Sequence, residues 1–439
     1  MSTTLFVNLR WFRRSMLLAM ACAVQITWAQ EPLSLPQAQR LAVGRALQLT
    51  AQNAVISATR EMAVAAGQLP DPVLKFGVEN LPITGPDTFN FTRDFMTMRR
   101  IGIAQDFPRE EKRKLKTERL EHDSERLVAQ RRTTLAAVQR DTALAWLDRH
   151  YALAMRGLLV QQQQETALQA QAAETAFRSG RGSQADVFVA RAALGLLADR
   201  MSQIDRQSRS AALQLERWIG PAAARLPAGV PPWQSSVLAA ELFPEAPHGH
   251  PESPFDRHLQ SHPQVAALAA QLQAAQVDSS LAEANKSADW SVEASFSQRG
   301  PDFSNMISLV FSVPIQWDRA KRQDRELAAK VAMVAEAQAL YDDMLRSRET
   351  ELRTLHNDWQ NGKERVAHYV AQLLPLARLR SEAALAVYRS AKGDLASVLA
   401  ARRDEIEVRL QAIAVEAETA RLWAQLEFSV PDPTVEAQQ

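Results

Sequence analysis

Four histidines lie close together near the middle of the chain, at His248, His250, His258 and His262. Neutral imidazole is a common ligand for zinc, copper and nickel, so these side chains could bind a transition metal. The stretch around them is rich in proline, and histidines spread through such a segment are more often simply solvated. We therefore assign no metal site and keep the four histidines as weak candidates.

Three methionines, Met96, Met98 and Met306, fall close to segments with a strand pattern. Their thioethers could pass on copper or silver, although contact with the protein core or with lipid is the simpler interpretation. A basic run from Arg109 to Lys116 either meets anionic groups at a membrane boundary or begins a solvent-exposed helix. The sequence does not decide between these two.

The chain has no motif typical of catalysis. It contains no Ser/His/Asp arrangement, no phosphate-binding glycine loop and no helical His-Glu-x-x-His pattern. Its 51 basic and 50 acidic residues are nearly balanced, which gives no indication of nucleic-acid binding. We expect a protein that is not an enzyme and needs no cofactor.

The first 29 residues have the pattern of a signal peptide. Three arginines precede an apolar run from Met16 to Ile26, which is too short to span a bilayer, and cleavage is expected before Gln30. The single cysteine, Cys22, lies in this segment, so the mature chain would have no disulfide or thiolate site. The alternative, lipid attachment at Cys22, is weakened by Met20, which fits a lipidation site poorly.

The rest of the chain is a tandem duplication of about 210 residues. The segment 176–191 aligns without a gap with the segment 387–402, which lies 211 residues further on. Identical pairs include Arg178/Arg389, Ser179/Ser390, Gly182/Gly393, Ala185/Ala396, Val187/Val398 and Arg191/Arg402. We divide the chain into a signal peptide (1–29), a first repeat (30–220), an inter-repeat linker (221–261), a second repeat (262–427) and a disordered tail (428–439).

Each repeat contains a very long predicted helix. No proline occurs between Pro108 and Pro221, and apolar residues recur there at spacings of three, four and seven, as in a coiled coil. A helix from Arg109 to about Phe177 would be roughly 100 Å long. The second repeat contains a corresponding helix from Asp318 to Ser390, and we expect a kink or break in it at Pro375.

Both long helices end at turns that reverse the chain into a helical hairpin. In the first turn Gly180 and Gly182 can take left-handed conformations, and Ser183 with Asp186 resembles a capping box for the returning helix.

Four segments alternate apolar and polar residues with a period of two, as β-strands do. They begin near Leu74, Arg100, Trp290 and Ile307. The pattern fits a lipid-facing barrel with a wet lumen, and equally a soluble sheet packed on helices; the signal peptide and the long helices favour the membrane. After the leader no apolar run reaches 18 residues, so a crossing would need strands. Four strands cannot close a barrel, so chains must share one.

These features together resemble the TolC-like outer-membrane efflux proteins. The resemblance rests on the leader, the duplication, the two strand pairs, the paired turns and the stretch Leu374-Pro375-Leu376-Ala377 ahead of Tyr388–Gly393, and it covers essentially the whole mature chain. It implies a mainly α fold with β, in which a homotrimer forms one α/β barrel in outer-membrane lipid and a helical tunnel in the periplasm. Each protomer would supply four strands and long coiled-coil helices. The implied partners are a periplasmic adaptor (membrane fusion protein) and an inner-membrane pump of the RND type.

Three stretches are similar to the heavy-metal branch of these proteins, namely Leu69–Val73, Asn80–Asp87 and Met96–Pro108. Through the resemblance, the turns would be the tips that contact the adaptor. These residues are Arg178, Ser179, Gly180, Arg181, Gly182 and Ser183 in the first repeat, and Arg389, Ser390, Lys392, Gly393 and Asp394 in the second.

The resemblance also implies a gate just after the tips. Asp186 matches an acidic gate position, whereas Ser397 and Ala400 stand where the family prototype carries aspartates, which casts doubt on a cation-binding gate. The alternative function is a periplasmic coiled-coil adaptor or a structural scaffold of a transport complex. An adaptor usually has one hairpin flanked by small β domains, whereas here two hairpins each follow a strand pair.

Overall fold

The computed structural model describes residues 32–229, 232–244, 254–390 and 392–432. The predicted signal peptide, Cys22, His248, His250 and the last seven residues lie outside this described part. The chain forms two compact units, each built from segments of both sequence halves. Unit 1 takes Met1–Ala42, Thr142–Pro231 and Tyr369–Ala417, and unit 2 takes Val43–Asp141, Pro232–His368 and Glu418–Gln439. The repeat boundaries given above therefore stay a prediction.

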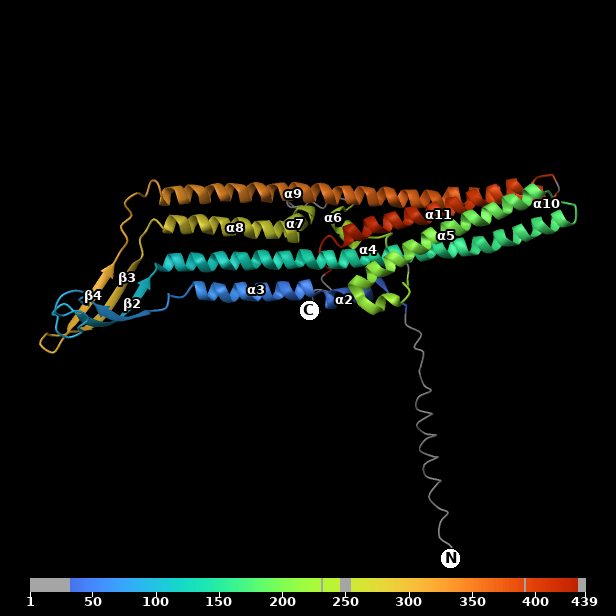
Figure 1. Ribbon diagram of the computed structural model, residues 1–439. Coiled ribbons are helices and arrows are strands. Elements are labelled where there is room, and N and C mark those ends of the chain that lie inside the picture. The colour runs from blue at the N-terminus through green and yellow to red at the C-terminus, as the bar shows by residue number, and fades with distance from the viewer. Residues whose placement is uncertain (1–31, 230–231, 245–253, 391, 433–439) are drawn as a thin grey trace, which may run out of the picture. The chain divides into compact units, whose positions relative to one another are not determined.

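Unit 2 contains a set of long helices that run side by side (Figure 1). They are α3 (Leu47–Ala66), the first part of α4 (Glu110–Arg178), α8 (Pro263–Ala284) and α9 (Gln323–His368). Polar side chains link them: Asp278 on α8 pairs with Arg119 of α4 at 2.8 Å and with Lys330 of α9 at 2.9 Å. One carboxylate thus holds a helix from each sequence half.

A four-stranded antiparallel sheet forms the other part of unit 2. Its strands are β1 (Val73–Glu79), β2 (Met98–Phe107), β3 (Trp290–Gln298) and β4 (Met306–Ser312), in the order β1-β2-β3-β4. The four predicted strands are therefore confirmed. β2 pairs with β3, which joins the strand pair of the first half to that of the second. β1 and β4 are the two edges of this sheet.

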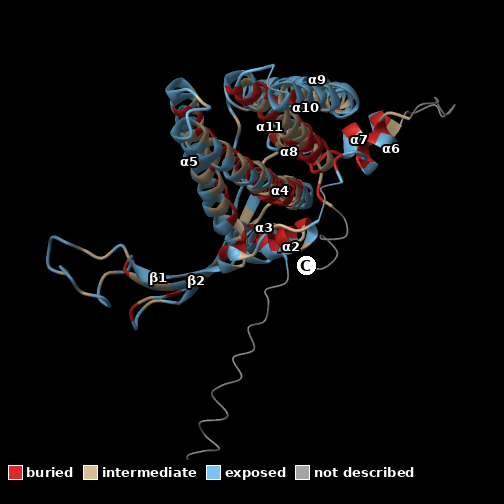
Figure 2. Ribbon diagram, turned by 90° about the vertical axis from the view of Figure 1, so that its right-hand side faces the viewer, coloured by how far each residue is buried: buried red, intermediate tan, exposed pale blue. Residues whose placement is uncertain are grey.

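The two faces of the sheet differ in character, as the alternation predicts. One face carries large apolar side chains that are exposed, among them Phe76 (82 %) and Ile307 (80 %). The other carries glycine, serine and charged residues together with five apolar ones, Val73, Met98, Ala104, Met306 and Val310. Figure 2 shows β1 and β2 as largely exposed ribbons. This sheet therefore does not bury its apolar face within the described chain.

Unit 1 is built from two helical hairpins. The first joins the second part of α4 to α5 (Gln184–Ile219), and the second joins α10 (Leu374–Arg389) to α11 (Leu395–Glu427). The short helix α2 (Leu35–Arg45) and the 3₁₀ turn η1 (Gly220–Ala224) complete the unit. The start of the described chain is fixed here, because Leu33 is fully buried and its carbonyl accepts a hydrogen bond from Trp146 Nε1 at 2.9 Å.

The long helix of the first repeat is confirmed, since α4 runs without interruption for 69 residues. The break predicted at Pro375 is also present. A π-helical turn, η2 (Tyr369–Leu373), separates α9 from α10, and Pro375 lies in the first turn of α10. Proline lacks the N–H of a regular helical bond, so a local change of hydrogen-bond pattern before it accommodates the missing donor.

Two details differ from the sequence predictions, namely the start of the second long helix and the packing of the chain just after α11. The second long helix begins at Gln323 and not at Asp318, because residues 318–322 form turns in which the Asp318 carboxylate accepts from the Lys321 N–H. The linker contains the helices α6 (Val237–Leu242) and α7 (Pro254–Ser261). Past α11 the chain stays packed at first: Phe428 is buried against Trp423, so the predicted disordered tail begins too early.

Among the described residues, no helix is both long enough and apolar enough to cross a membrane.

Candidate docking tips and the groove between the hairpins

The first hairpin turn is closed by backbone hydrogen bonds to the end of α4. The N–H groups of Arg181 and Gly182 both donate to the carbonyl of Ala176, at 2.9 and 3.1 Å. Gly180 takes the predicted left-handed conformation with φ 72°, which a side chain would strain. Gly182 does not, contrary to the prediction. Gly182 is needed here because it has no side chain: a Cβ at this position would lie 3.0 Å from the Cβ of Ala176.

The second turn lies against the end of the preceding helix in the same way, although residue 391 is outside the described part of the chain. A Cβ on Gly393 would lie 2.9 Å from Val387 Cγ1, so this glycine also permits close approach to the preceding helix. The two serines of the turns act alike. Ser179 Oγ donates to the Ala176 carbonyl at 3.0 Å, and Ser390 Oγ donates to the Val387 carbonyl at 2.8 Å.

The helices that leave the turns are capped by the same pair of residue types in opposite order. In the first repeat Ser183 Oγ accepts from the Asp186 N–H at 3.1 Å, and Asp186 Oδ2 accepts from the Ser183 N–H at 3.1 Å. This is the capping box predicted from sequence. In the second repeat Asp394 is the cap, and its Oδ1 accepts from the Ser397 N–H at 2.6 Å. These hydrogen bonds to the charged form lower the pKa of Asp394.

The tips are rich in exposed cationic side chains. Arg178, at the end of α4, pairs with Glu174 at 3.3 Å, and the same carboxylate pairs with Arg191 of α5 at 3.1 Å. Glu174 therefore joins both arms of the first hairpin. Arg181, Arg389 and Lys392 are exposed as well. Position 385, the equivalent of Glu174 in the second repeat, is a leucine, so the second tip lacks this cross-arm acid.

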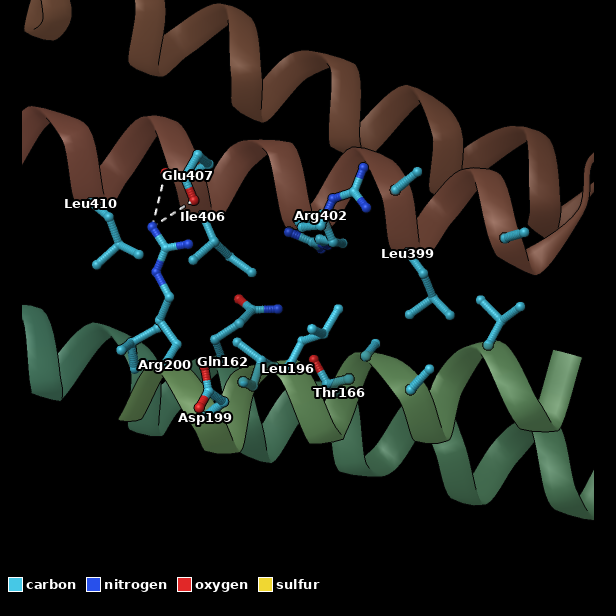
Figure 3. Close-up of a pocket in the computed structure, with 18 of the residues that line it drawn as sticks. Gln162, Thr166, Leu196, Asp199, Arg200, Leu399, Arg402, Ile406, Glu407 and Leu410 are labelled. Atoms are coloured by element: carbon cyan, nitrogen blue, oxygen red, sulfur yellow. Dashed lines mark hydrogen bonds and ion pairs between the residues drawn. The ribbon is translucent and has the colours of Figure 1, made fainter. Parts of the chain in front are cut away.

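A groove of about 560 Å³ runs between α5 and α11, with α4 contributing part of its wall (Figure 3). Leu159, Ile204, Ile406 and Leu410 form a buried apolar cluster beneath it. Nearer the turns, a second buried cluster joins the two hairpins and consists of Ala173, Val187, Ala190, Leu395 and Leu399. The groove therefore has an apolar floor made by both hairpins.

Charged side chains form the rim of this groove. Arg200 of α5 pairs with Glu407 of α11 at 2.9 Å across it, as the dashed lines in Figure 3 show. Arg402 and Arg403 lie on the same wall as Glu407. An apolar floor with a charged rim is the usual composition of a surface that binds another protein chain.

The three predicted gate residues have different surroundings. Ala400 lines the groove, whereas Asp186 and Ser397 do not belong to its lining. The Asp186 carboxylate is occupied in the capping box, and the Ser397 N–H in the bond to Asp394. Sequence reasoning did not single out Arg200 and Glu407. They are not equivalent positions of the two repeats, so only the packing of the hairpins brings them together.

Of the two described histidines of the predicted cluster, His262 is buried and His258 is half-buried, which corrects the simpler interpretation. His262 is buried at the start of α8, and its Nδ1 accepts from the Gln264 N–H at 3.3 Å. The ring of His258 lies 6.5 Å from it. Burial lowers the pKa of both histidines, that of His262 to about 4. Within the described residues, no three side chains of His, Cys, Asp or Glu are grouped to hold a metal ion.

No family model and no curated protein sequence matches the chain, but solved structures do. The outer-membrane channel OprN matches with a TM-score of 0.72 and 17 % identity, over 90 % of this chain and 89 % of that one. CusC, which forms a transmembrane channel, matches with a TM-score of 0.75 and 14 % identity, over 90 % and 91 %. The outer-membrane protein VceC of Vibrio cholerae gives 0.72 and 15 %, over 90 % and 95 %.

At such low identity the likeness establishes the fold. The chain has the fold of these outer-membrane channels, mainly helical with a small antiparallel sheet, and the fold that the TolC-like resemblance implies is confirmed.

Proposed function

We propose that the chain is one protomer of a homotrimeric outer-membrane exit duct, which passes solutes out of the periplasm and catalyses no reaction. The observation that carries this proposal is the open four-stranded sheet with an exposed apolar face. Exposed apolar surface of this extent needs a cover in a folded protein, and lipid provides one.

The edges of the same sheet support the oligomer. β1 and β4 are the edges of the sheet and present unpaired backbone N–H and C=O groups. In lipid, each unpaired group would cost roughly several kcal/mol. Pairing of β1 in one copy with β4 in the next satisfies both edges and closes a barrel. Three copies supply twelve strands, an even number within the range of such barrels.

The helical hairpins of unit 1 are proposed to meet the partner proteins. The exposed cations of the two tips and the groove between α5 and α11 fit a periplasmic adaptor, which would connect the duct to an inner-membrane pump of the RND type. In this proposal Asp186, Ser397 and Ala400 stand at the gate that opens when the adaptor docks.

The transported solutes are proposed to include heavy-metal cations, on the strength of the three sequence stretches that are similar to the heavy-metal branch. Deletion of the gene, followed by growth on copper, silver, zinc, cobalt and several drugs, tests this point. Sensitivity to drugs alone would contradict the metal assignment and leave the duct intact.

A periplasmic adaptor or scaffold is the alternative. The fold matches outer-membrane channels over most of the chain, and the sheet exposes apolar side chains where a water-soluble adaptor would bury them. Fractionation separates the two functions. The duct is expected in the outer membrane and, after extraction in mild detergent, at three times the mass of one chain. A monomer that stays in solution without detergent would contradict the proposal.

A further inference from the structure

Four charged side chains form one connected group on the polar face of the sheet: Lys75 and Glu79 of β1, Arg100 of β2, and Glu293 of β3. We name them the charge quartet. Glu293 is its centre, with Oε2 at 2.7 Å from Lys75 Nζ and Oε1 at 2.5 Å from Arg100 Nη2. Arg100 Nη1 continues the chain to Glu79 Oε1 at 2.6 Å.

The strand register explains how side chains so far apart along the strands can meet. Arg100 is paired with Ser297, and Glu293 is paired with Ala104, so on this face of the sheet one row of residues lies between the two charges. That row contains Gly102 and Ser295. Because these residues are small, the Arg100 side chain can pass over them to Glu293.

Gly102 is needed for this arrangement. A Cβ at this position would lie 2.8 Å from the Cβ of Ser295 and 3.0 Å from the carbonyl oxygen of Ala294, closer than real side chains approach. The polar face is therefore shaped around the ion pairs, with the small residues at the crossing point.

The quartet occupies the face opposite Phe76, Ile101 and Ile307, which are exposed apolar residues. Placing a charged side chain on the lipid face of a barrel costs roughly 2–4 kcal/mol at the bilayer midplane but only about 0–1 kcal/mol near the membrane surfaces. The face with the quartet is therefore not the one toward lipid, whereas a single cation near the start of β2, Arg99, can lie on the lipid face. If the chain forms the proposed duct, the charge quartet then lines the lumen.

We propose that the charge quartet sets the ion selectivity of the barrel lumen: its two cations and two anions balance each other, while Asp106, on the same face of β2, adds one negative charge for each copy. This inference rests on the proposed function. Rings of charged side chains determine which ions a pore prefers, and a balanced group favours neither sign. A duct lined in this way lets solutes of either charge leave.

Neutralising Glu293 and neutralising Lys75 should change the net charge of the quartet, and with it the ion preference, in opposite directions. Glu293→Gln leaves two cations and one anion in each copy, which should favour anions. Lys75→Gln leaves one cation and two anions, which should favour cations. A unit charge about 10 Å from the ion path in watery surroundings changes the local concentration of an ion by about twofold.

The test uses the full-length mature protein, reconstituted in planar lipid bilayers between unequal KCl solutions, with the K⁺/Cl⁻ permeability ratio taken from the reversal potential. We expect a wild-type ratio moderately above one because of Asp106, a fall of about twofold or more for Glu293→Gln, and a rise of similar size for Lys75→Gln.

Two controls separate lumen charge from other effects. Arg99→Gln removes the same unit of charge from the opposite face of β2, and it should leave the ratio at the wild-type value. The double variant Lys75→Gln/Glu293→Gln restores the balance and should return the ratio to that of the wild type, which excludes a general distortion of the sheet.

Unchanged ratios in both single variants, or shifts equal to that of Arg99→Gln, would overturn the role of the quartet while leaving the duct intact. A wild-type protein that inserts as a trimer but conducts no ions would contradict the proposed function itself, and this inference with it.

Discussion

Asp394 accepts a hydrogen bond from the backbone N–H of Ser397 at 2.6 Å, and this bond starts the helix α11. At the equivalent place in the first repeat, Ser183 accepts from Asp186 at 3.1 Å. The two repeats have thus kept a serine and an aspartate three positions apart and exchanged their order. Asp186, which the resemblance assigns to the gate, is thus part of a helix cap, and so is Asp394, which the resemblance assigns to the second tip.

Removal of the first cap should loosen the start of α5. Ser183→Ala removes the oxygen that accepts from Asp186, and losses of this kind cost about 0.5–2 kcal/mol. We expect hydrogen exchange of the amides at positions 184–187 to become roughly 2- to 30-fold faster, with no change in the mass of the oligomer. Exchange at the wild-type rate would show that Asp186 alone holds this turn.

The cap at Asp394 should depend on pH. Its pKa is lowered in the folded protein, so the stabilisation is complete above the ordinary pKa of a free aspartate and is lost as pH falls through the lowered value. Exchange at positions 395–398 should therefore rise in acid beyond the intrinsic change. Asp394→Asn keeps an acceptor that does not titrate, and it should remove that dependence.

His262 should make the stability of unit 2 sensitive to mild acid. Burial, assisted by the charges of Arg348 and His258, lowers the pKa of His262 to about 4, whereas a free histidine titrates near 6.5. The neutral form is favoured in the folded state, so its contribution is complete above pH 6.5 and is lost as pH falls toward 4. The loss is on the order of 2–4 kcal/mol for each chain.

Thermal unfolding between pH 7.5 and 4.5 measures this effect. His262→Asn keeps an N-cap acceptor for α8 without a titrating group, so its melting temperature should fall less on acidification. His368→Asn changes an exposed histidine and serves as the control. Equal acid sensitivity in wild type and His262→Asn would contradict this assignment.

Gly362 allows α9 to approach α11 within unit 2. A Cβ there would lie 2.5 Å from Thr419 Oγ1 and 3.0 Å from its Cγ2, so Gly362→Ala should destabilise the protein by about 1–3 kcal/mol. Thr419→Ala in the same chain should recover part of the loss. Gly157→Ala is the matched control, because its Cβ would meet nothing within 4 Å, and it should be neutral or stabilising by about 0.4–1 kcal/mol.

The cations of the tips should matter for adaptor docking. Arg178→Glu/Arg389→Glu reverses one exposed cation in each turn, and we expect weaker copurification with the adaptor and an unchanged trimer. Arg45→Glu/Arg325→Glu makes the same charge change at exposed positions away from the turns and should copurify normally. Unchanged copurification of the tip variant would count against these turns as the docking site.

The sequence was sufficient for features that depend on local chemistry. The run of helix-forming residues without proline predicts α4, the period of two predicts the four strands, and Pro375 predicts the break before α10. Ser183 and Asp186 predict a capping box, which the structure contains. In each case the cause lies within a few residues of its effect.

Features that depend on packing could not be predicted in this way. The pair Arg200 and Glu407 forms only because the two hairpins lie together, and no spacing in the sequence indicates it. His262 is buried because α8 packs on its neighbours, although its own segment is polar and rich in proline. Gly182 was assigned a left-handed conformation from its residue type, whereas the turn needs its lack of a side chain.

The proposed duct depends most on the open edges of the sheet, β1 and β4, pairing between copies. Cysteine scanning in the outer membrane tests it most directly, because the only native cysteine, Cys22, lies in the predicted leader. Gly77→Cys on β1 is combined in turn with Ser308→Cys or Ser312→Cys on β4, and with Ser295→Cys on the inner strand β3 as the control. We predict disulfide-linked dimers and trimers for at least one β1/β4 pair and none for the control. No cross-link from any β1/β4 pair, in protein that is otherwise folded, would contradict the account.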